Sequence, residues 1–176
     1  MIVRAFKGKV PKIAPSAFIA EGVVIIGDVE VGEHANIWYG SVLRADVGFI
    51  RIGARSNVQD GSCLHMTSEL SNAVIGVEVT VGHGVIVHGA TVQDGALVGM
   101  GSVLLDNSVI GEESLIAAGT VVPPRMIVPP RSLVRGQPGR VIRELNEHER
   151  LEGRRGAAHY LDLAAEHAGL CDVPRG

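Results

Sequence analysis

The chain has 176 residues, a formal net charge of −3 and two cysteines. Hydrophobic residues make up 46% of it, but aromatic residues make up only 3%. This length suits one domain with a buried core, and no basic cluster indicates a nucleic-acid or membrane surface. The widely separated Cys63 and Cys171 do not predict a disulfide. No apolar run is long enough for a signal or membrane segment, so we expect a cytoplasmic protein that binds neither nucleic acid nor membrane.

Aliphatic residues recur every six positions, with short breaks that shift the frame. If each six-residue unit forms one side of a triangular coil, these side chains all point inward, and small residues fit at the corners. A β-sandwich would instead alternate with period two over unevenly spaced strands. We therefore predict an all-β solenoid, a β-helix of hexapeptide repeats, over residues 1–137. The inward positions are Ile13, Ile19, Ile25, Val31, Ile37, Leu43, Ile52, Val58, Leu64, Ile75, Val81, Val87, Val92, Val98, Leu104, Ile110, Ile116, Val122, Val128 and Val134.

The repeat ends near residue 137, and residues 138–176 are expected to form a helical tail packed on the β-helix. Residues 140–145 predict a short helical turn. Asn146 and Glu149 then have the spacing of a capping box, in which each side chain binds the backbone N–H of the other residue.

A longer C-terminal helix is expected after this cap. Two glycines, Gly153 and Gly156, predict a kink or break within it. Its apolar residues at helical spacing are Leu151, Ala158, Leu161 and Ala165.

Functional residues are expected where the repeat departs from the needs of packing. The position after the inward aliphatic is usually Gly or Ala, but four positions carry large polar residues instead. Because they share one phase of the repeat, we expect them to line one edge of the solenoid. His83 stands one position further along its hexad, so its side chain should project elsewhere, and Asp60 shares that phase. Asp46 stands two positions further along its hexad. The four residues of the shared phase are Arg44, Gln59, His65 and His88.

Three histidines in one part of the chain indicate a metal site, because neutral imidazoles bind zinc and three protein ligands leave one position open. His83 faces away from His65 and His88, so the three can meet only if His83 comes from another copy in a closed three-fold assembly. The alternative is a set of surface or interface histidines without metal. Imidazole ligands also accept Fe²⁺ or Co²⁺ in place of Zn²⁺.

Several motifs together resemble the gamma-class carbonic anhydrases. They are Arg44-Ala45-Asp46, Ser56-Asn57-Val58-Gln59-Asp60-Gly61, Leu64-His65 and Val81-Gly82-His83-Gly84-Val85-Ile86-Val87-His88-Gly89. The resemblance covers nearly the whole chain and reaches the helix that carries Tyr160. It implies a left-handed parallel β-helix that forms a homotrimer, with zinc or iron at each subunit interface. His65 and His88 of one chain and His83 of its neighbour would be the ligands.

The resemblance also implies roles for the remaining residues. Arg44 and Asp46 would form a salt bridge between subunits. Gln59 would hydrogen-bond near the metal-bound water, and Asp60 would join the same network. Tyr160 matches a family tyrosine near the site.

The chemistry implied is that of a lyase, in which a metal-bound hydroxide adds reversibly to carbon dioxide to give bicarbonate. A bound metal makes hydroxide available by lowering the pKa of water from 15.7 to about 7. Two departures indicate that the acidic proton-shuttle loop is missing: Val47 stands where the most active members have Glu, and Glu69 is the only carboxylate in residues 66–74. Hydration is therefore expected to be weak or absent.

Two other functions stay open, because one fold can host several activities. The first is an acyl-CoA thioesterase or an enzyme related to the acyltransferases of this fold. The second is a non-catalytic trimeric scaffold with a structural metal. The ligand-like trio of histidines and the short insertions favour a metal site over acyl transfer.

Overall fold

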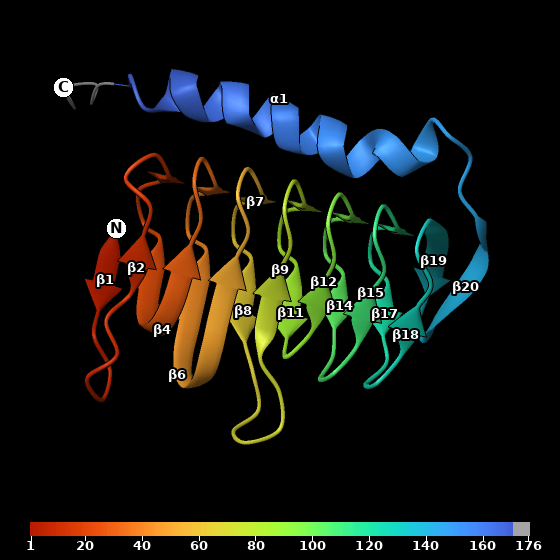
Figure 1. Ribbon diagram of the computed structural model, residues 1–176, viewed down its shortest axis with the longest axis horizontal. Coiled ribbons are helices and arrows are strands. Elements are labelled where there is room, and N and C mark those ends of the chain that lie inside the picture. The colour runs from red at the N-terminus through yellow and green to blue at the C-terminus, as the bar shows by residue number, and fades with distance from the viewer. Residues whose placement is uncertain (171–176) are drawn as a thin grey trace, which may run out of the picture.

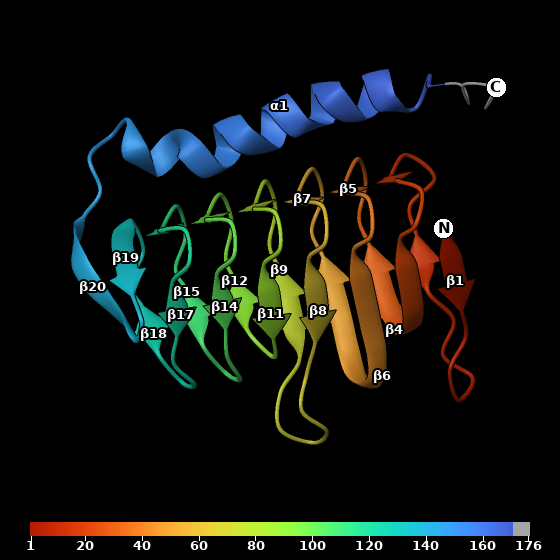
Figure 2. The ribbon, with the colours of Figure 1, turned by 180° about the vertical axis from the view of Figure 1, so that it is seen from behind.

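A computed structural model describes residues 1–170 and shows a left-handed parallel β-helix of about seven turns with one C-terminal helix. Successive coils lie side by side along the long axis of the molecule (Figures 1 and 2). Cys171 lies outside the described residues, and Cys63 is a free thiol. The solenoid predicted from the six-residue period is thus confirmed.

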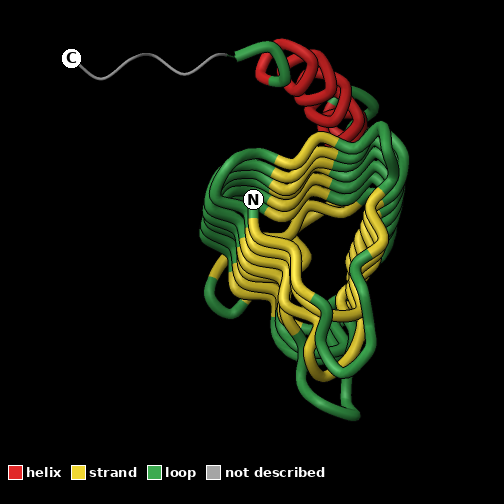
Figure 3. The backbone as a smooth tube through the Cα atoms, turned by 90° about the vertical axis from the view of Figure 1, so that its left-hand side faces the viewer, coloured by secondary structure: helices red, strands yellow, loops and turns green. Residues whose placement is uncertain are grey.

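The coils enclose a roughly triangular core, seen end-on in Figure 3. We name the three faces for what they carry. The histidine face comprises β1 (Ile2–Arg4), the first parts of β4 (Val24–Val31) and β6 (Val42–Ile52), β8 (Cys63–His65), β11 (Ile86–His88), β14 (Val103–Leu104) and β17 (Val121–Val122). The groove face comprises β2 (Lys12–Ile13), the later parts of β4 and β6, β9 (Ala73–Ile75), β12 (Thr91–Val92), β15 (Val109–Ile110) and β18 (Ile127–Val128). The helix face comprises β3 (Phe18–Ile19), β5 (Asn36–Ile37), β7 (Asn57–Val58), β10 (Thr80–Val81), β13 (Leu97–Val98), β16 (Leu115–Ile116), β19 (Ser132–Gly136) and β20 (Gly139–Glu144).

The core consists of the predicted inward aliphatics, which stack in register from coil to coil. On the histidine face, for example, Leu64 pairs with Leu43 on one side and Val87 on the other, and all three are fully buried. Only Ile13 and Ile19, at the N-terminal end of the stack, are partly exposed. Small residues occupy the corners as predicted, and the Ser41 hydroxyl donates to the carbonyl of Gln59 in the next coil at 2.9 Å.

The predicted helical turn at residues 140–145 is wrong, because this segment forms the strand β20. It pairs antiparallel with β19 through a hairpin in which Gly136 faces Gly139. The β-branched Val141 and Ile142 favour a strand here, and pairing satisfies the backbone groups that the last coil would otherwise leave free. β20 therefore belongs to the helix-face sheet, although it follows the boundary predicted at residue 137. That boundary itself stays a prediction.

The C-terminal helix follows a capping box, as predicted. The Asn146 side chain accepts from the backbone N–H of Glu149 at 2.9 Å, and the Glu149 carboxylate accepts from the N–H of Asn146 at 3.0 Å. A 3-10 turn η1 (Glu149–Leu151) leads into α1 (Glu152–His167), which runs back along the helix face (Figure 1).

The predicted break at the two glycines is wrong, because α1 is continuous through both. Each glycine instead lets the helix approach the solenoid closely. A Cβ at Gly153 would lie 2.1 Å from the carbonyl oxygen of Gly95, and one at Gly156 would lie 2.6 Å from the Thr80 hydroxyl. The buried side of α1 is consequently not the predicted apolar face. It comprises Gly153, Ala157 and Ala164.

Two further contacts hold the helix along the stack. Arg154 pairs with Glu78, while its Nε lies 3.6 Å from a carboxylate oxygen of Glu113. At the other end of the helix, the His167 ring packs on the edge of Trp38 at 4.9 Å. Within residues 1–170, no helix has the length and apolarity needed to cross a membrane.

The glycine contact predicts that Gly153→Ala destabilises the protein, although alanine favours an isolated helix by about 1 kcal/mol. The added methyl has only backbone to displace, so we expect a net loss of about 1–3 kcal/mol in the free energy of unfolding. Urea denaturation measures this loss. The fluorescence of Trp38, the single tryptophan, reports undocking of the helix.

Asp162→Ala, at an exposed position of the same helix, is the control, and it should change stability by less than about 0.5 kcal/mol. A Gly153→Ala protein with the stability and fluorescence of the wild type would show that close approach of the helix backbone is not required.

Candidate metal centre

Two imidazoles meet at the edge where the histidine face ends. β8 and β11 are adjacent parallel strands that bring His65 opposite His88, because each follows a buried residue of the stack, Leu64 or Val87. His65 Nδ1 lies 3.4 Å from His88 Nε2. The strand register therefore places these two histidines at one shared edge, as predicted.

A carboxylate holds the outer nitrogen of each ring. His65 Nε2 lies 3.0 Å from Asp46 Oδ1, and His88 Nδ1 lies 3.3 Å from Asp106 Oδ2. Arg44 pairs with Asp46 within the same chain. If both outer nitrogens donate to these carboxylates, both inner nitrogens present lone pairs to the same gap. A cation or a shared proton is then needed between them.

The two carboxyl groups have lowered pKa values. For Asp46, burial acts to raise the pKa, but hydrogen bonding to His65 and the charge and hydrogen bond of Arg44 outweigh it. For Asp106, burial again acts to raise the pKa, and hydrogen bonds from Ser71 and Thr67 together with His88 outweigh it. Both groups are therefore held as carboxylates beside the imidazole rings.

The spacing of the two inner nitrogens fits a metal ion. Two ligands of a tetrahedral zinc site with Zn–N bonds of 2.0–2.1 Å lie about 3.3 Å apart, and the observed separation is 3.4 Å. Carboxylates on the outer nitrogens are the usual partners of zinc-binding histidines. Within the described part of a single chain, however, no group of three or more His, Cys, Asp or Glu side chains could hold a metal ion.

His83 lies at the opposite edge of the histidine face, at the corner that follows β10. Its Nδ1 is 2.9 Å from Asp60 Oδ2, and the Tyr160 hydroxyl lies 3.2 Å from its Nε2. About half of the His83 side chain is exposed. The strand β11 separates His83 from His88, and at about 3.3 Å per residue they cannot share an ion within one chain.

The structure does not bring Gln59 to the edge predicted for it. Gln59 follows β7 on the helix face, where it is buried and donates to the Asn57 side chain at 3.1 Å. A shared phase places residues in one column only if they are also separated by a whole coil. Gln59 is one hexad, and therefore one face, away from His65. Asp60, which shares the phase of His83 in the repeat, lies beside His83.

Tyr160 reaches this second corner from α1. Its ring packs edge-on against Trp38 at 5.1 Å, and burial, together with the nearby charge of Asp60, raises its pKa. His167 is partly buried here, and its Nδ1 lies 2.9 Å from the Tyr39 hydroxyl. The helix thus supports the corner that carries His83.

Three residues of the His88 edge were missed from the sequence: Asp106, Thr67 and Ser71. The Thr67 hydroxyl donates to Asp106 at 3.1 Å, and Ser71 donates to its other oxygen. The repeat itself gives no signal for Asp106, because the strand register pairs Val87 with Leu104 and so places Leu105, not Asp106, one coil after His88.

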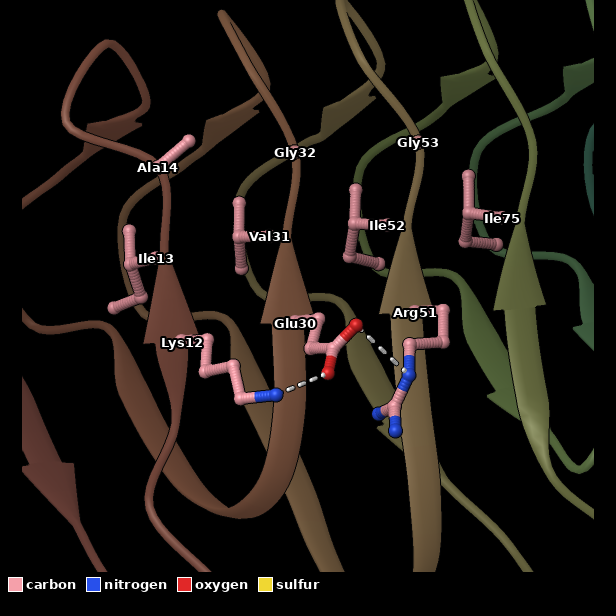
Figure 4. A pocket seen from close by; sticks show the side chains of 10 residues that line it. All are labelled: Lys12, Ile13, Ala14, Glu30, Val31, Gly32, Arg51, Ile52, Gly53 and Ile75. Carbon is pink, nitrogen blue, oxygen red and sulfur yellow. Dashed lines mark hydrogen bonds and ion pairs between the residues drawn. The ribbon is translucent and has the colours of Figure 1, made fainter.

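A separate groove lies on the groove face near the N-terminal coils (Figure 4). Its charged side chains are paired with one another. Lys12 donates to Glu30 at 3.0 Å, and Arg51 Nε lies 3.3 Å from the same carboxylate. Arg51 also donates to Asp28 at 2.7 Å. No histidine is among the residues that line this groove, so it is separate from the His65–His88 pair.

Known proteins are similar to this chain in both fold and sequence. The family profile of the bacterial transferase hexapeptide (six repeats) matches residues 11–45 and 89–124. A carbonic anhydrase of Geobacillus kaustophilus is 46% identical over 96% of this chain and 92% of its own length. Gamma carbonic anhydrase 1 of Arabidopsis thaliana, named as mitochondrial, is 39% identical over 91% of this chain. The chain spans only 60% of the length of that plant protein.

A solved structure agrees closely over the whole solenoid. The hexapeptide transferase family protein of Anaplasma phagocytophilum superposes with a TM-score of 0.90 at 38% identity, covering 94% of this chain and 97% of that one. The fold and the paired imidazoles define a hexapeptide-repeat protein with a histidine site on one edge. The chain belongs to the gamma-class carbonic anhydrase family of such proteins.

The ion pairs beside the groove predict an acid-dependent loss of stability. Burial acts to raise the pKa of Asp28, but Arg51 and Lys9 outweigh it and hold the pKa below the ordinary 3.8. The stabilisation is therefore complete above about pH 4 and is lost as the pH falls through the lower, folded-state value. We expect the difference in the free energy of unfolding between wild type and Asp28→Asn to shrink as the pH is lowered.

Denaturation of metal-free protein over a series of pH values makes this measurement, with exposed Asp162→Asn as the control. The ion-pair interpretation would be contradicted if the difference in the free energy of unfolding between wild type and Asp28→Asn stayed constant down to strongly acidic pH.

Proposed function

We propose that this protein is a metal-dependent carbonic anhydrase that hydrates carbon dioxide at the interfaces of a homotrimer. The observation that carries the proposal is the pair of facing nitrogens on His65 and His88, 3.4 Å apart, with carboxylates on the outer nitrogen of each ring. The named relatives support the same activity. Zinc fits this donor set, and Fe²⁺ or Co²⁺ are alternatives. A cytoplasmic location stays a prediction.

The surface between the two histidine edges supports a trimer. The outward side chains of the histidine face form an apolar column, and Ile86 at its centre is 42% exposed in the single chain. Such a column favours burial against another protein surface. Its members are Val24, Val42, Cys63, Ile86, Val103 and Val121.

The two edges of that face carry complementary parts of the site. His83 lies where the face begins, while His65 and His88 lie where it ends. In a closed three-fold assembly, each edge of one copy meets the opposite edge of the next. His83 of one copy would then complete the pair of its neighbour. Trimerisation would also carry Asp60 and Tyr160, which hold His83, to the same interface.

In the proposed reaction, residues of this chain would orient the metal ligands and balance charge around a bound ion. A bound zinc ion would supply the Lewis acidity that makes water a nucleophile near neutral pH. Asp46 and Asp106 orient the two ligand rings, and Arg44 balances the charge of Asp46. Gln59 is buried beneath α1 and bonded to Asn57, so its predicted contact with bound water would require a neighbouring chain to approach it.

A complementation experiment tests the shared site. His83→Ala and His88→Ala should each fold but lose the metal. When the two variants are co-expressed in equal amounts, about one quarter of the interfaces should pair an intact His83 with an intact His65–His88 edge and regain metal. Metal analysis of the purified trimers measures this recovery.

His148→Ala, at an exposed position far from these edges, is the matched control and should keep full metal content. Mixed trimers without metal, or single variants that retain it, would contradict a site shared between chains. A protein that stays monomeric would contradict the proposal as a whole.

The activity is tested by measuring carbon dioxide hydration and thioester hydrolysis side by side on zinc-loaded protein. We expect hydration that falls by about 100-fold or more in His88→Ala. Because Glu69 is the only carboxylate of the loop after His65, proton release should limit the rate. The turnover number should therefore rise with the concentration of a small imidazole buffer.

The transferase family profile and the transferase named among the relatives favour one second candidate, an acyl-CoA thioesterase or acyltransferase-related enzyme. Thioester hydrolysis without hydration would support it. Absence of both activities in a metal-loaded trimer would support a scaffold with a structural metal.

A further inference from the structure

Asp106 collects three side-chain contacts at the corner between the histidine and groove faces. His88 Nδ1 lies 3.3 Å from its carboxylate, and the hydroxyls of Thr67 and Ser71 donate to it. Thr67 and Ser71 belong to the loop that connects β8 with β9, which protrudes from the stack in Figure 1. Within the described residues, His88 is the only basic side chain within ion-pair distance of the Asp106 carboxylate.

We propose that Asp106 is a positioning residue that fixes the His88 ring with its proton on Nδ1, leaving the Nε2 lone pair for the metal ion. This inference rests on the proposed function, because it concerns a ligand of that same site. A neutral imidazole carries one proton, and the hydrogen bond of one nitrogen decides which nitrogen can bind a metal.

The surroundings of Asp106 hold its carboxylate in place. The Ser71 hydroxyl also accepts from the backbone N–H of Thr67 at 3.2 Å, which closes the base of the loop. The side chain of Asn107 donates to the carbonyl of Leu70 at 3.3 Å. At Gly89 a Cβ would lie 2.0 Å from the Ser71 hydroxyl and 2.4 Å from a carboxylate oxygen of Asp106. The carboxylate therefore has little room to leave His88.

The carboxylate of the other ligand is held differently. Asp46 is shared between His65 and Arg44, and the Arg44 side chain is 45% exposed. Asp106 instead takes its two other contacts from uncharged hydroxyls. A hydroxyl leaves the negative charge available to the imidazole, whereas an arginine partly neutralises it. The orientation of His88 thus depends on one carboxylate, and the loop supports that carboxylate.

The experiment follows the His88 ring directly. Nitrogen-15 NMR of histidine-labelled, metal-free protein at mildly alkaline pH reports which ring nitrogen carries the proton. We expect the Nδ1-protonated form in the wild type and a change toward the Nε2-protonated form in Asp106→Ala. Zinc affinity, measured by competition with a chelator, should fall by roughly 10- to 100-fold in that variant.

Two further variants separate positioning from simple support of the corner. In Asp106→Asn the amide oxygen can still accept from Nδ1, so we expect a smaller loss of zinc affinity. In Thr67→Val with Ser71→Ala the carboxylate remains, so the ring should keep its proton on Nδ1 while affinity falls by a smaller factor. Asp94→Asn is the control and should match the wild type, because this exposed carboxylate lies at another corner, where it accepts from the backbone N–H of Val77.

If folded Asp106→Ala protein kept the His88 proton on Nδ1, or kept the zinc affinity of the wild type, the assignment would be overturned. If the His88 proton moved to Nε2 in Thr67→Val with Ser71→Ala, which retains Asp106, the assignment would also be overturned. The loop, and not the carboxylate, would then decide which ring nitrogen carries the proton. If the wild type binds no zinc at all, the proposed function fails, while the NMR measurement on metal-free protein still decides the role of Asp106.

Discussion

The stacking of inward aliphatic side chains is the constraint on which the rest of this structure depends. Leu43, Leu64 and Val87 can fill the core only if consecutive coils stay in register, so every outward neighbour is held in register too. His65 and His88 face each other for this reason. A one-residue slip would turn them into the core and the aliphatics out into water.

The corners are where the chain departs from this constraint. They bear no aliphatic column, so they accept extra residues without disturbing the stack. The two insertions that follow Arg44 and His65 lie at the same corner of the coil, and both return side chains to the histidine pair. Asp46 comes from the first insertion, while Thr67 and Ser71 of the second hold Asp106. Packing therefore fixes the two imidazoles, and the corners supply the side chains that surround them.

Most of the fold could be predicted from the sequence because one physical requirement repeats in nearly every hexad. The same period could not decide the face on which Gln59 lies, since phase alone does not count whole coils. The strand at Val141 and Ile142 was missed because its partner is the free edge of the last coil, which is a tertiary feature. The unbroken helix through Gly153 was missed because backbone contact overrode helix propensity.

The part of the candidate site that the repeat positions could also be predicted from the sequence. The pairing of His65 with His88, and the orientation of His83 away from them, follow from their phases in the repeat. The contacts of Asp106 with Thr67 and Ser71 could not be predicted from the repeat, because they depend on how residues 66–72 fold back on the corner.

The course of the C-terminal helix has a consequence for how the molecule unfolds. A solenoid is a one-dimensional array in which each coil touches only its nearest neighbours, so its ends ordinarily fray first. Here the last described helix returns from the final coils to the early ones, and His167 reaches Tyr39 across 128 positions of sequence. This strap ties the two ends of the array into one cooperative unit, in which loss of an end coil also loosens the other end.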